Sequence, residues 1–291
     1  MLWRLYVFYG RRYARLAHAL SFENHIFAEN SMAMDFIDTH SHLYAEEFDN
    51  DRAEAIDRCF GAGVNRLILP DIDATSRQAM LDLAASDPQR FFPCAGLHPT
   101  SVDGDYKSGL KQVEAMLAGG QRFYAVGEIG IDLYWDQTFE REQFDAFVTQ
   151  VKWAKELDLP VIVHIRNAIE KTITALEPLA DNRLRGVFHC FSGTLEQAHE
   201  AIGMGFMLGI GGVLTYKKSE LPSIVEQVDI KHILLETDCP YLAPVPHRGK
   251  RNESSFLPFV AQKLAEIKHI SIEEVAEQTT ANAEKMFCLN R

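Results

Sequence analysis

The sequence predicts an α/β protein whose single domain is a (β/α)8 TIM-type barrel. From Met34 onward, short apolar runs alternate with longer segments of helical periodicity. Eight such runs occur within about 250 residues, whereas an open doubly wound sheet usually contains fewer strands. The length of 291 residues and the apolar share of 47% also fit a globular domain with a sizeable core.

Each expected strand is one of the apolar runs. In chain order they are residues 36–39, 66–70, 91–96, 123–126, 161–164, 186–189, 206–210 and 232–236. Helical segments separate them, and in residues 138–157 the side chains of Phe144, Phe147 and Val151 fall roughly on one face. Residues 255–267 and 271–287 supply the eighth helix and one more. Ser271 and Glu274 form a capping-box pair at the start of the last helix.

Residues 1–33 differ in composition from the rest of the chain. The first twenty positions hold four Arg and no acidic residue, and the longest apolar run, residues 5–9, is shorter than the core of a secretory signal. An Arg-rich transit peptide is a weaker alternative, because Glu23 and Glu29 interrupt the basic segment. We interpret residues 1–33 as an N-terminal extension of uncertain role and residues 34–291 as the barrel domain.

Charge and cysteine content narrow the function classes. With 29 Lys and Arg against 41 Asp and Glu, the net charge of −12 argues against binding long nucleic acid on a broad positive face. A short substrate held locally is still compatible with this charge.

The five cysteines include no CxxC pair and indicate thiols in a reducing compartment. No apolar stretch approaches the ~20 residues that span a bilayer. We expect a cytoplasmic protein without membrane contact or an obligatory protein partner.

Polar side chains follow the expected strands at the end where barrel enzymes place their chemistry. The first run ends in Asp38-Thr39-His40-Ser41-His42, and strand alternation places His40 and His42 side by side. The candidates after other strands are Glu128, His164, His189 and Asp238. Isolated buried carboxylates and imidazoles are costly, so six such groups at one mouth predict cations between them.

Two divalent ions are the expected cofactors, because four imidazoles and two carboxylates exceed the ligands of one zinc ion. In this interpretation Glu128 bridges the ions. The other ligands divide into two sets, with His40, His42 and Asp238 on one ion and His164 and His189 on the other. Nitrogen and oxygen donors suit Zn²⁺, Mn²⁺ or Mg²⁺, and the sequence does not choose among them.

Four neighbouring side chains have other expected roles. Cys190 and Cys239 each follow a candidate ligand by one residue, so alternation turns them to the opposite face. Asp38 and Glu236 share the parity of ligands but lie deeper, and we expect them to hydrogen-bond to imidazoles.

The chain resembles the TatD-type metal-dependent DNases of the amidohydrolase-like metallohydrolase superfamily. The motifs that carry the resemblance are Phe36-Ile-Asp-Thr-His-Ser-His42, Gly96-Leu-His-Pro99, Gly127-Glu-Ile-Gly-Ile-Asp132, His164, His189-Cys-Phe-Ser-Gly193, Leu235-Glu-Thr-Asp-Cys-Pro-Tyr241 and Pro246-His-Arg-Gly-Lys-Arg-Asn-Glu253. They occur in family order through nearly the whole chain after Met34. Ser254 stands where the family usually has Pro, which predicts a softer substrate loop without loss of a ligand.

The resemblance implies a two-metal hydrolase of phosphodiester bonds, most often a 3′-to-5′ exonuclease on single-stranded DNA and sometimes on RNA. The family's metal positions fall on the six residues found at the strand ends. We expect Asp238 to accept a proton from the attacking water while Glu128 bridges the ions. His98, His247 and Arg248 are the candidates for binding the phosphates of a short or single-stranded nucleic acid.

Alternatives remain at several positions. Residues 247–251 also fit a solvated basic loop. Asn252 and Glu253 fit either loop pinning or substrate contact. Tyr134 and Trp135 fit either base stacking or packing.

Hydrolysis of C–N or ester bonds is a rival activity, although many such enzymes use a carbamylated lysine where this chain has Glu128. A non-catalytic metal-binding barrel is the second rival, and ligands with open coordination positions disfavour it.

Overall fold

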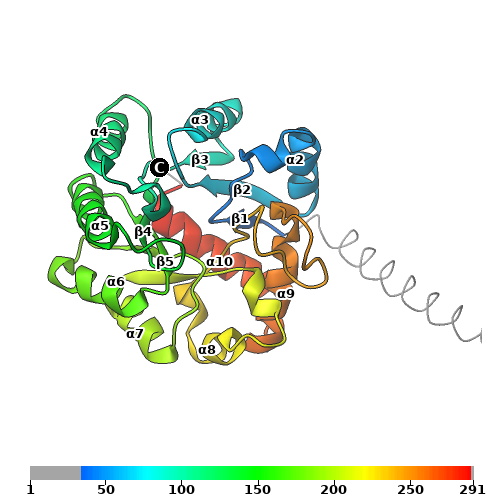
Figure 1. The fold of residues 1–291 in the computed structure, drawn as a ribbon. Coiled ribbons are helices and arrows are strands. Elements are labelled where there is room, and N and C mark those ends of the chain that lie inside the picture. Colours follow the sequence, from blue (N-terminus) through cyan, green and yellow to red (C-terminus); the bar gives the residue numbers. More distant parts are fainter. Residues whose placement is uncertain (1–33, 290–291) are drawn as a thin grey trace, which may run out of the picture.

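The computed structural model describes residues 34–289 and contains eight parallel strands alternating with helices (Figure 1). The extension predicted at residues 1–33 lies outside the described residues. The strands are β1 Phe36–Asp38, β2 Val64–Leu69, β3 Phe91–Pro93, β4 Val126–Asp132, β5 Val161–Arg166, β6 Gly186–Phe188, β7 Phe206–Ile210 and β8 Ile233–Leu235. The helices are α2 Arg52–Gly61, α3 Arg77–Ser86, α4 Tyr106–Leu117, α5 Glu140–Glu156, α6 Ile169–Leu176, α7 Leu195–Gly203, α8 Leu221–Gln227, α9 Leu257–Lys268 and α10 Ile272–Phe287.

Two parallel sheets, β1–β3 and β4–β8, meet at two seams. At the first seam, Gly127 N donates to Ala95 O over 2.9 Å, beside an isolated parallel bridge from Ala95 to Val126. At the second, Thr39 N donates to Leu235 O over 3.0 Å. These bonds join the eight strands into a ring and confirm the predicted TIM-type barrel.

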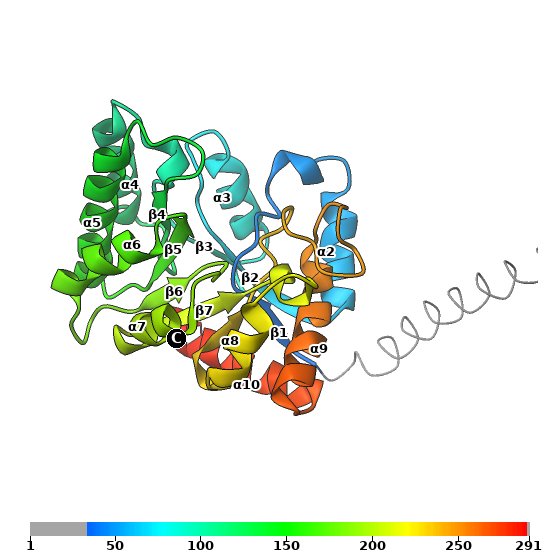
Figure 2. The same ribbon diagram turned by 60° about the horizontal axis from the view of Figure 1, so that its bottom comes forward.

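The barrel interior is filled at one end by apolar side chains. The cluster contains Ile37, Ile68, Phe92, Cys94, Ala125, Ile162, Val187, Leu234, Ala283, Met286 and Phe287. Its last three members belong to α10, which crosses the ring in Figure 1 and lies below the strands in Figure 2. Asn282 of α10 donates to the carbonyls of Ile230 and Ile233, just before and at the start of β8. Helix α10 therefore closes the N-terminal end of the barrel, and the C-terminal end carries the polar strand ends.

Most predicted elements lie close to their expected positions. Strand β7 has the predicted bounds, α5 lies within the predicted helix 138–157, and the capping box of Ser271 and Glu274 is present at the start of α10. The fourth strand was predicted too early, because β4 begins where that run ends and continues to Asp132. Two glycines and two carboxylates interrupt its apolar pattern, and a register irregularity lies between Val126 and Ile129.

Gly130 marks the closest approach of β4 to β5. A Cβ atom there would lie 1.9 Å from the carbonyl oxygen of His164. We expect Gly130→Ala to lower the free energy of unfolding by at least about 2 kcal/mol, because one strand must move away. Urea denaturation measures this effect, with Gly203→Ala as the control, since a Cβ on Gly203 meets no atom within 4 Å. Equal stability of the two variants would contradict the packing described for this strand pair.

No helix among residues 34–289 is long and apolar enough to cross a membrane.

Candidate metal centre

His40 and His42 lie just beyond β1, on a segment that pairs with the end of β8. Asp238 N donates to His40 O and His42 N donates to Cys239 O, each over 2.9 Å. These two bonds hold the segment against the chain that carries Asp238. The Nε2 atoms of the two imidazoles are 3.1 Å apart and are directed to the same point.

Glu128 lies within β4 rather than at its end, and its two carboxylate oxygens face different imidazoles. Oε2 is 3.1 Å from His40 Nε2 and 3.7 Å from His42 Nε2. Oε1 is 2.9 Å from His164 Nδ1 and 3.9 Å from His189 Nε2. Each oxygen is therefore directed at one of the two predicted histidine pairs.

Asp238 follows β8 in the left-handed backbone region, with φ of 56°. Aspartate tolerates this conformation better than most residues. Its Oδ1 lies 3.6 Å from His42 Nε2, 3.7 Å from His189 Nε2 and 3.9 Å from His40 Nε2. Its side chain is 16% exposed, against 4% for Glu128, so Asp238 is the more accessible of the two carboxylates from the barrel mouth.

Three groups of ligand atoms within the described chain are spaced closely enough to hold a metal ion. They are His40, His42 and Asp238; His98, Glu128 and His164; and His40, His189 and Glu236. In each group the ligand atoms lie within 4.8 Å of one another. The first matches one predicted ligand set. His189 approaches Glu128 and Asp238 but is not grouped with His164.

The electrostatics of His40 and Glu128 favour the protonation states that metal binding requires. Burial, together with the charge on His189, lowers the pKa of His40 to about 4, so this imidazole is neutral near pH 7. Burial opposes ionisation of Glu128, but His40 and His98 hold the pKa of its carboxyl well below its usual range. A neutral imidazole and an ionised carboxylate are the ligand forms of these residues.

Tyr44 determines which nitrogen of His42 faces the centre. The Tyr44 hydroxyl donates to the carbonyl of Pro70 and lies 2.8 Å from His42 Nδ1. Since its one proton goes to a carbonyl, the hydroxyl must accept from Nδ1–H. The lone pair of His42 is therefore on Nε2, beside Glu128 and Asp238. Tyr44 was not among the residues predicted from the sequence.

We expect Tyr44→Phe to weaken metal affinity about 10- to 100-fold, because Nδ1–H of His42 loses its buried acceptor. Competition with a chromophoric chelator measures the affinity. Tyr106→Phe is the matched control, since that hydroxyl donates to Asp145 on the outer helices. Equal affinities in both variants would contradict the orienting role of Tyr44.

Carboxylates also contact the other two imidazoles. His164 Nε2 is 2.9 Å from Asp132 Oδ2, and His189 Nδ1 is 2.9 Å from Glu236 Oε1. Burial alone would lower the pKa of His164, but the hydrogen bonds to Asp132 and Glu128 raise it to about 9. Glu236 thus lies at ion-pair distance from an imidazole, where a hydrogen bond was predicted. Asp132 was missed, although its spacing of four residues from Glu128 on one strand places both carboxylates on the same face.

The expected hydrogen bond from an imidazole to Asp38 is not among that carboxylate's contacts in the described chain. Asp38 instead accepts hydrogen bonds from Thr237 and Ser254 and from the backbone N–H of His40. Strand β1 ends at Asp38, so its alternation does not continue to His40 and the two side chains do not share a face. Ser254, expected to soften the loop, is buried and donates to Asp38 over 2.7 Å.

His98 is directed at the centre as a hydrogen-bond donor. Its Nδ1 accepts from Thr100 N over 3.2 Å, so in the neutral ring the proton resides on Nε2. That Nε2 lies 3.5 Å from Glu128 Oε1. A nitrogen that carries a proton cannot be a metal ligand, which favours substrate contact over metal binding for His98.

His247 and Arg248 lie on the loop after β8, held by aromatic rings. The His247 ring stacks on Phe256 at a centroid distance of 3.9 Å, and Arg248 Cζ lies 4.4 Å from the Tyr216 ring centroid. Neither belongs to the three groups of ligand atoms described above.

Ion pairs and backbone bonds fix the end of the same loop. Arg251 binds both carboxylate oxygens of Asp51, and Arg58 binds Glu253. Asn252 donates to the carbonyls of Thr237 and Tyr241. Asn252 and Glu253 thus pin the loop, which is one of the two roles considered for them.

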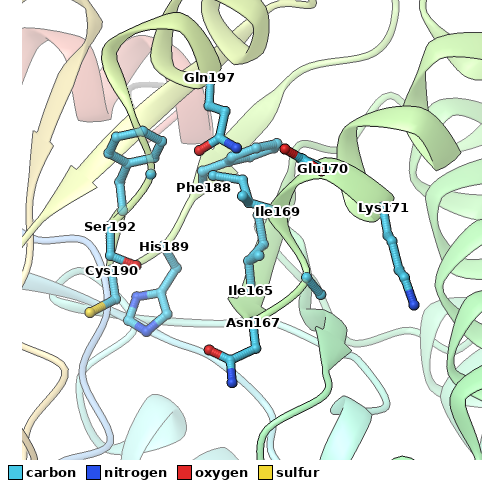
Figure 3. Close-up of a pocket in the computed structure, with 13 residues that line it drawn as sticks. Ile165, Asn167, Ile169, Glu170, Lys171, Phe188, His189, Cys190, Ser192 and Gln197 are labelled. Atoms are coloured by element: carbon cyan, nitrogen blue, oxygen red, sulfur yellow. The ribbon is translucent and has the colours of Figure 1, made fainter.

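A pocket of about 370 Å³ opens beside His189. Ile165, Ile169 and Phe191 contribute apolar walls, and Asn167 and Gln197 contribute amides. In Figure 3 the His189 imidazole, Asn167 and Gln197 border the same space. The candidate metal centre therefore adjoins a cavity with both polar and apolar walls.

The donor set fits divalent metal ions. It consists of buried imidazole nitrogens and carboxylate oxygens, and Tyr44 and Glu236 lie beside the outer ring nitrogens of His42 and His189. Carboxylate and hydroxyl partners of this kind orient histidine ligands in metalloenzymes.

The model of the TatD related DNase family matches residues 37–288. The chain belongs to this family. Two curated relatives span almost the same region. The uncharacterized metal-dependent hydrolase YabD of Bacillus subtilis is 35% identical over 254 residues, covering 87% of this chain and 99% of YabD. The 3′-5′ ssDNA/RNA exonuclease TatD of Erwinia tasmaniensis is 32% identical over 256 residues, covering 85% of this chain and 97% of that protein.

A solved structure gives the same result for the fold. The crystal structure of YjjV, a TatD homologue from Escherichia coli K12, has a TM-score of 0.81 and 31% identity to this chain. The match covers 87% of this chain and 98% of YjjV. This chain is accordingly a metal-dependent hydrolase of the family, with His, Glu and Asp clusters able to bind metal.

Proposed function

We propose that this protein hydrolyses phosphodiester bonds with two divalent metal ions, as a 3′-to-5′ exodeoxyribonuclease on single-stranded DNA that also accepts RNA. The observation that carries the proposal is the position of Glu128, whose Oε2 faces His40 and His42 while Oε1 faces His164 and His189. A carboxylate between two sets of imidazoles suits a bridge between two ions. The relative from Erwinia tasmaniensis bears the name of such an exonuclease.

In the proposed centre, Glu128 would be shared by the two ions. His40, His42 and Asp238 would hold one ion, and His164 and His189 would hold the other. Zn²⁺, Mn²⁺ and Mg²⁺ all suit these donors. When bound, such ions lower the pKa of a water molecule and neutralise charge on the phosphate.

Asp238 is the proposed proton acceptor. Its carboxylate is the more exposed of the two at the centre, and neighbouring imidazoles, His189 foremost, keep its pKa below the usual range despite burial. An ionised carboxylate at the mouth can orient the attacking water and take its proton. The water oxygen adds to phosphorus, the P–O3′ bond breaks, and O3′ of the shortened strand receives a proton.

His98 is proposed to stabilise the reacting phosphate. Nε2–H points to the centre from a ring that Thr100 fixes, so little reorganisation is needed when negative charge develops on a phosphate oxygen. His247 and Arg248 would supply positive charge to the substrate strand from their loop. The cysteines in residues 34–289 are all free thiols, which fits the proposed location in the cytoplasm.

The test is digestion of single-stranded DNA labelled at its 5′ end, in parallel with RNA of the same sequence. Mg²⁺, Mn²⁺ or Zn²⁺ is returned to chelator-treated protein, and Asp238→Asn serves as the inactive control. We expect a metal-dependent ladder that shortens from the 3′ end. Protein that binds two ions but cleaves neither strand would contradict the proposal. Activity on amides or lactones, without activity on p-nitrophenyl phosphodiesters, would support the rival hydrolase.

A further inference from the structure

Two exposed aromatic rings and an arginine lie next to the metal centre, on the loop after β4 and at the end of β5. Trp135 is 69% exposed and Tyr134 is 53% exposed. Their ring centroids are 5.0 Å apart in an edge-on arrangement. Arg166 Cζ lies 3.9 Å from the Tyr134 centroid and 5.0 Å from the Trp135 centroid. We call these three residues the aromatic platform.

The platform is tied directly to a proposed metal ligand. Asp132 Oδ1 accepts hydrogen bonds from the backbone N–H groups of Tyr134 and Trp135, over 2.9 and 3.3 Å. Oδ2 of the same carboxylate lies 2.9 Å from His164 Nε2. Arg166 is the register partner of Asp132 on β5 and follows His164 by two residues. One carboxylate therefore fixes the platform relative to His164.

The exposure of these side chains argues against a packing role. An indole that packs in a core loses most of its exposed surface, whereas Trp135 retains more than two thirds of it. Among residues 34–289, no carboxylate lies within ion-pair distance of Arg166, so its charge stays available while its guanidinium covers the rings. Aromatic faces next to an unpaired cation suit a ligand that is both planar and anionic.

We propose that Tyr134, Trp135 and Arg166 form a stacking subsite for an unpaired nucleobase of the substrate strand, held against the metal centre by Asp132. The proposal rests on the proposed nuclease function and identifies the part of the substrate that this side of the site recognises. Bases in a duplex are covered by their neighbours on both faces, so the subsite selects single strands. Arg166 then lies beside the stacked base, where it contacts its face or the adjoining phosphate.

The kinetic test compares two short single-stranded DNA oligomers of equal length. One is natural, and the other lacks the bases of its 3′-terminal nucleotides. We expect wild-type protein to prefer the natural oligomer in kcat/KM, and Trp135→Ala to reduce this preference about 10-fold. Trp135→Phe should retain most of the preference, and Tyr106→Ala, a ring on the outer helices, is the matched control. An unchanged preference in Trp135→Ala would overturn the proposal.

A binding test separates this inference from the nuclease function. Holoenzyme is titrated with a phosphorothioate oligomer that resists hydrolysis, and tryptophan fluorescence is recorded. Stacking on Trp135 should quench the fluorescence, and Trp135→Phe should lose this quenching. Quenching without cleavage of natural DNA would support the subsite and contradict the nuclease. Cleavage without base preference and without quenching would overturn the subsite and leave the nuclease standing.

Discussion

Asp238→Asn is expected to reduce turnover of a single-stranded DNA substrate at least ~100-fold, because the amide cannot accept the proton of the attacking water. The substitution preserves side-chain size, and the main-chain bond from residue 238 to His40 O does not depend on the carboxylate. Initial rates at saturating metal measure the effect. Metal content is determined in the same samples, so that a lost proton acceptor is distinguished from a lost ion.

The control is Asp229→Asn, just before the opposite end of β8, where the side chain accepts a hydrogen bond from Lys231 N and asparagine can do the same. This variant should keep wild-type turnover. If Asp238→Asn turned over at the wild-type rate with both ions bound, Asp238 would not be the proton acceptor.

Glu128→Gln is expected to reduce turnover at least ~1,000-fold and to lower the metal content from two ions to one or fewer. The reason is geometric, since the carboxylate supplies one oxygen to each histidine pair and an amide offers a single oxygen. Metal analysis after gel filtration gives the stoichiometry, and single-turnover digestion gives the rate.

Glu236→Gln is the matched control for Glu128→Gln. Both residues are buried glutamates at the same mouth, but Glu236 contacts His189 Nδ1, the outer nitrogen of that ring. We expect this variant to bind both ions, with affinity reduced about 10- to 100-fold. Two tightly bound ions in Glu128→Gln would exclude Glu128 as the bridge.

The barrel could be predicted because its strands are apolar and regularly spaced. The prediction failed at β4, where Gly127, Glu128, Gly130 and Asp132 break up the apolar run. Only the outward side chains of that strand are apolar, and the inward ones are small or ionised. Apolar runs therefore identify most buried strands, but they do not identify β4, the strand that contributes most to the candidate metal centre.

Four of the six predicted ligands follow a strand, whereas Glu128 and His164 lie within β4 and β5. All six could be proposed because barrel geometry brings the carboxyl-terminal parts of the strands together. The partners that orient them could not be found in the same way. The Tyr44 hydroxyl contacts both the carbonyl of Pro70 and Nδ1 of His42. Asp38 accepts hydrogen bonds from Thr237 and Ser254 and, within residues 34–289, not from an imidazole. These contacts depend on side-chain direction beyond the regular strand, where alternation no longer applies. Asp132 is the exception, because strand spacing alone relates it to Glu128.

Because the candidate metal centre spans the seam between β1 and β8, it forms late in biosynthesis. His40 and Asp238 come from opposite ends of the barrel sequence, and the bridged pair Ser41 and Cys239 is separated by 198 positions. Contacts at such separation form slowly, after the intervening loop is closed. A ribosome-bound chain that has exposed the first seven strands carries His40, His42 and Glu128 but lacks Asp238. The nascent polypeptide therefore cannot complete its candidate ligand set until the last strand emerges from the ribosome.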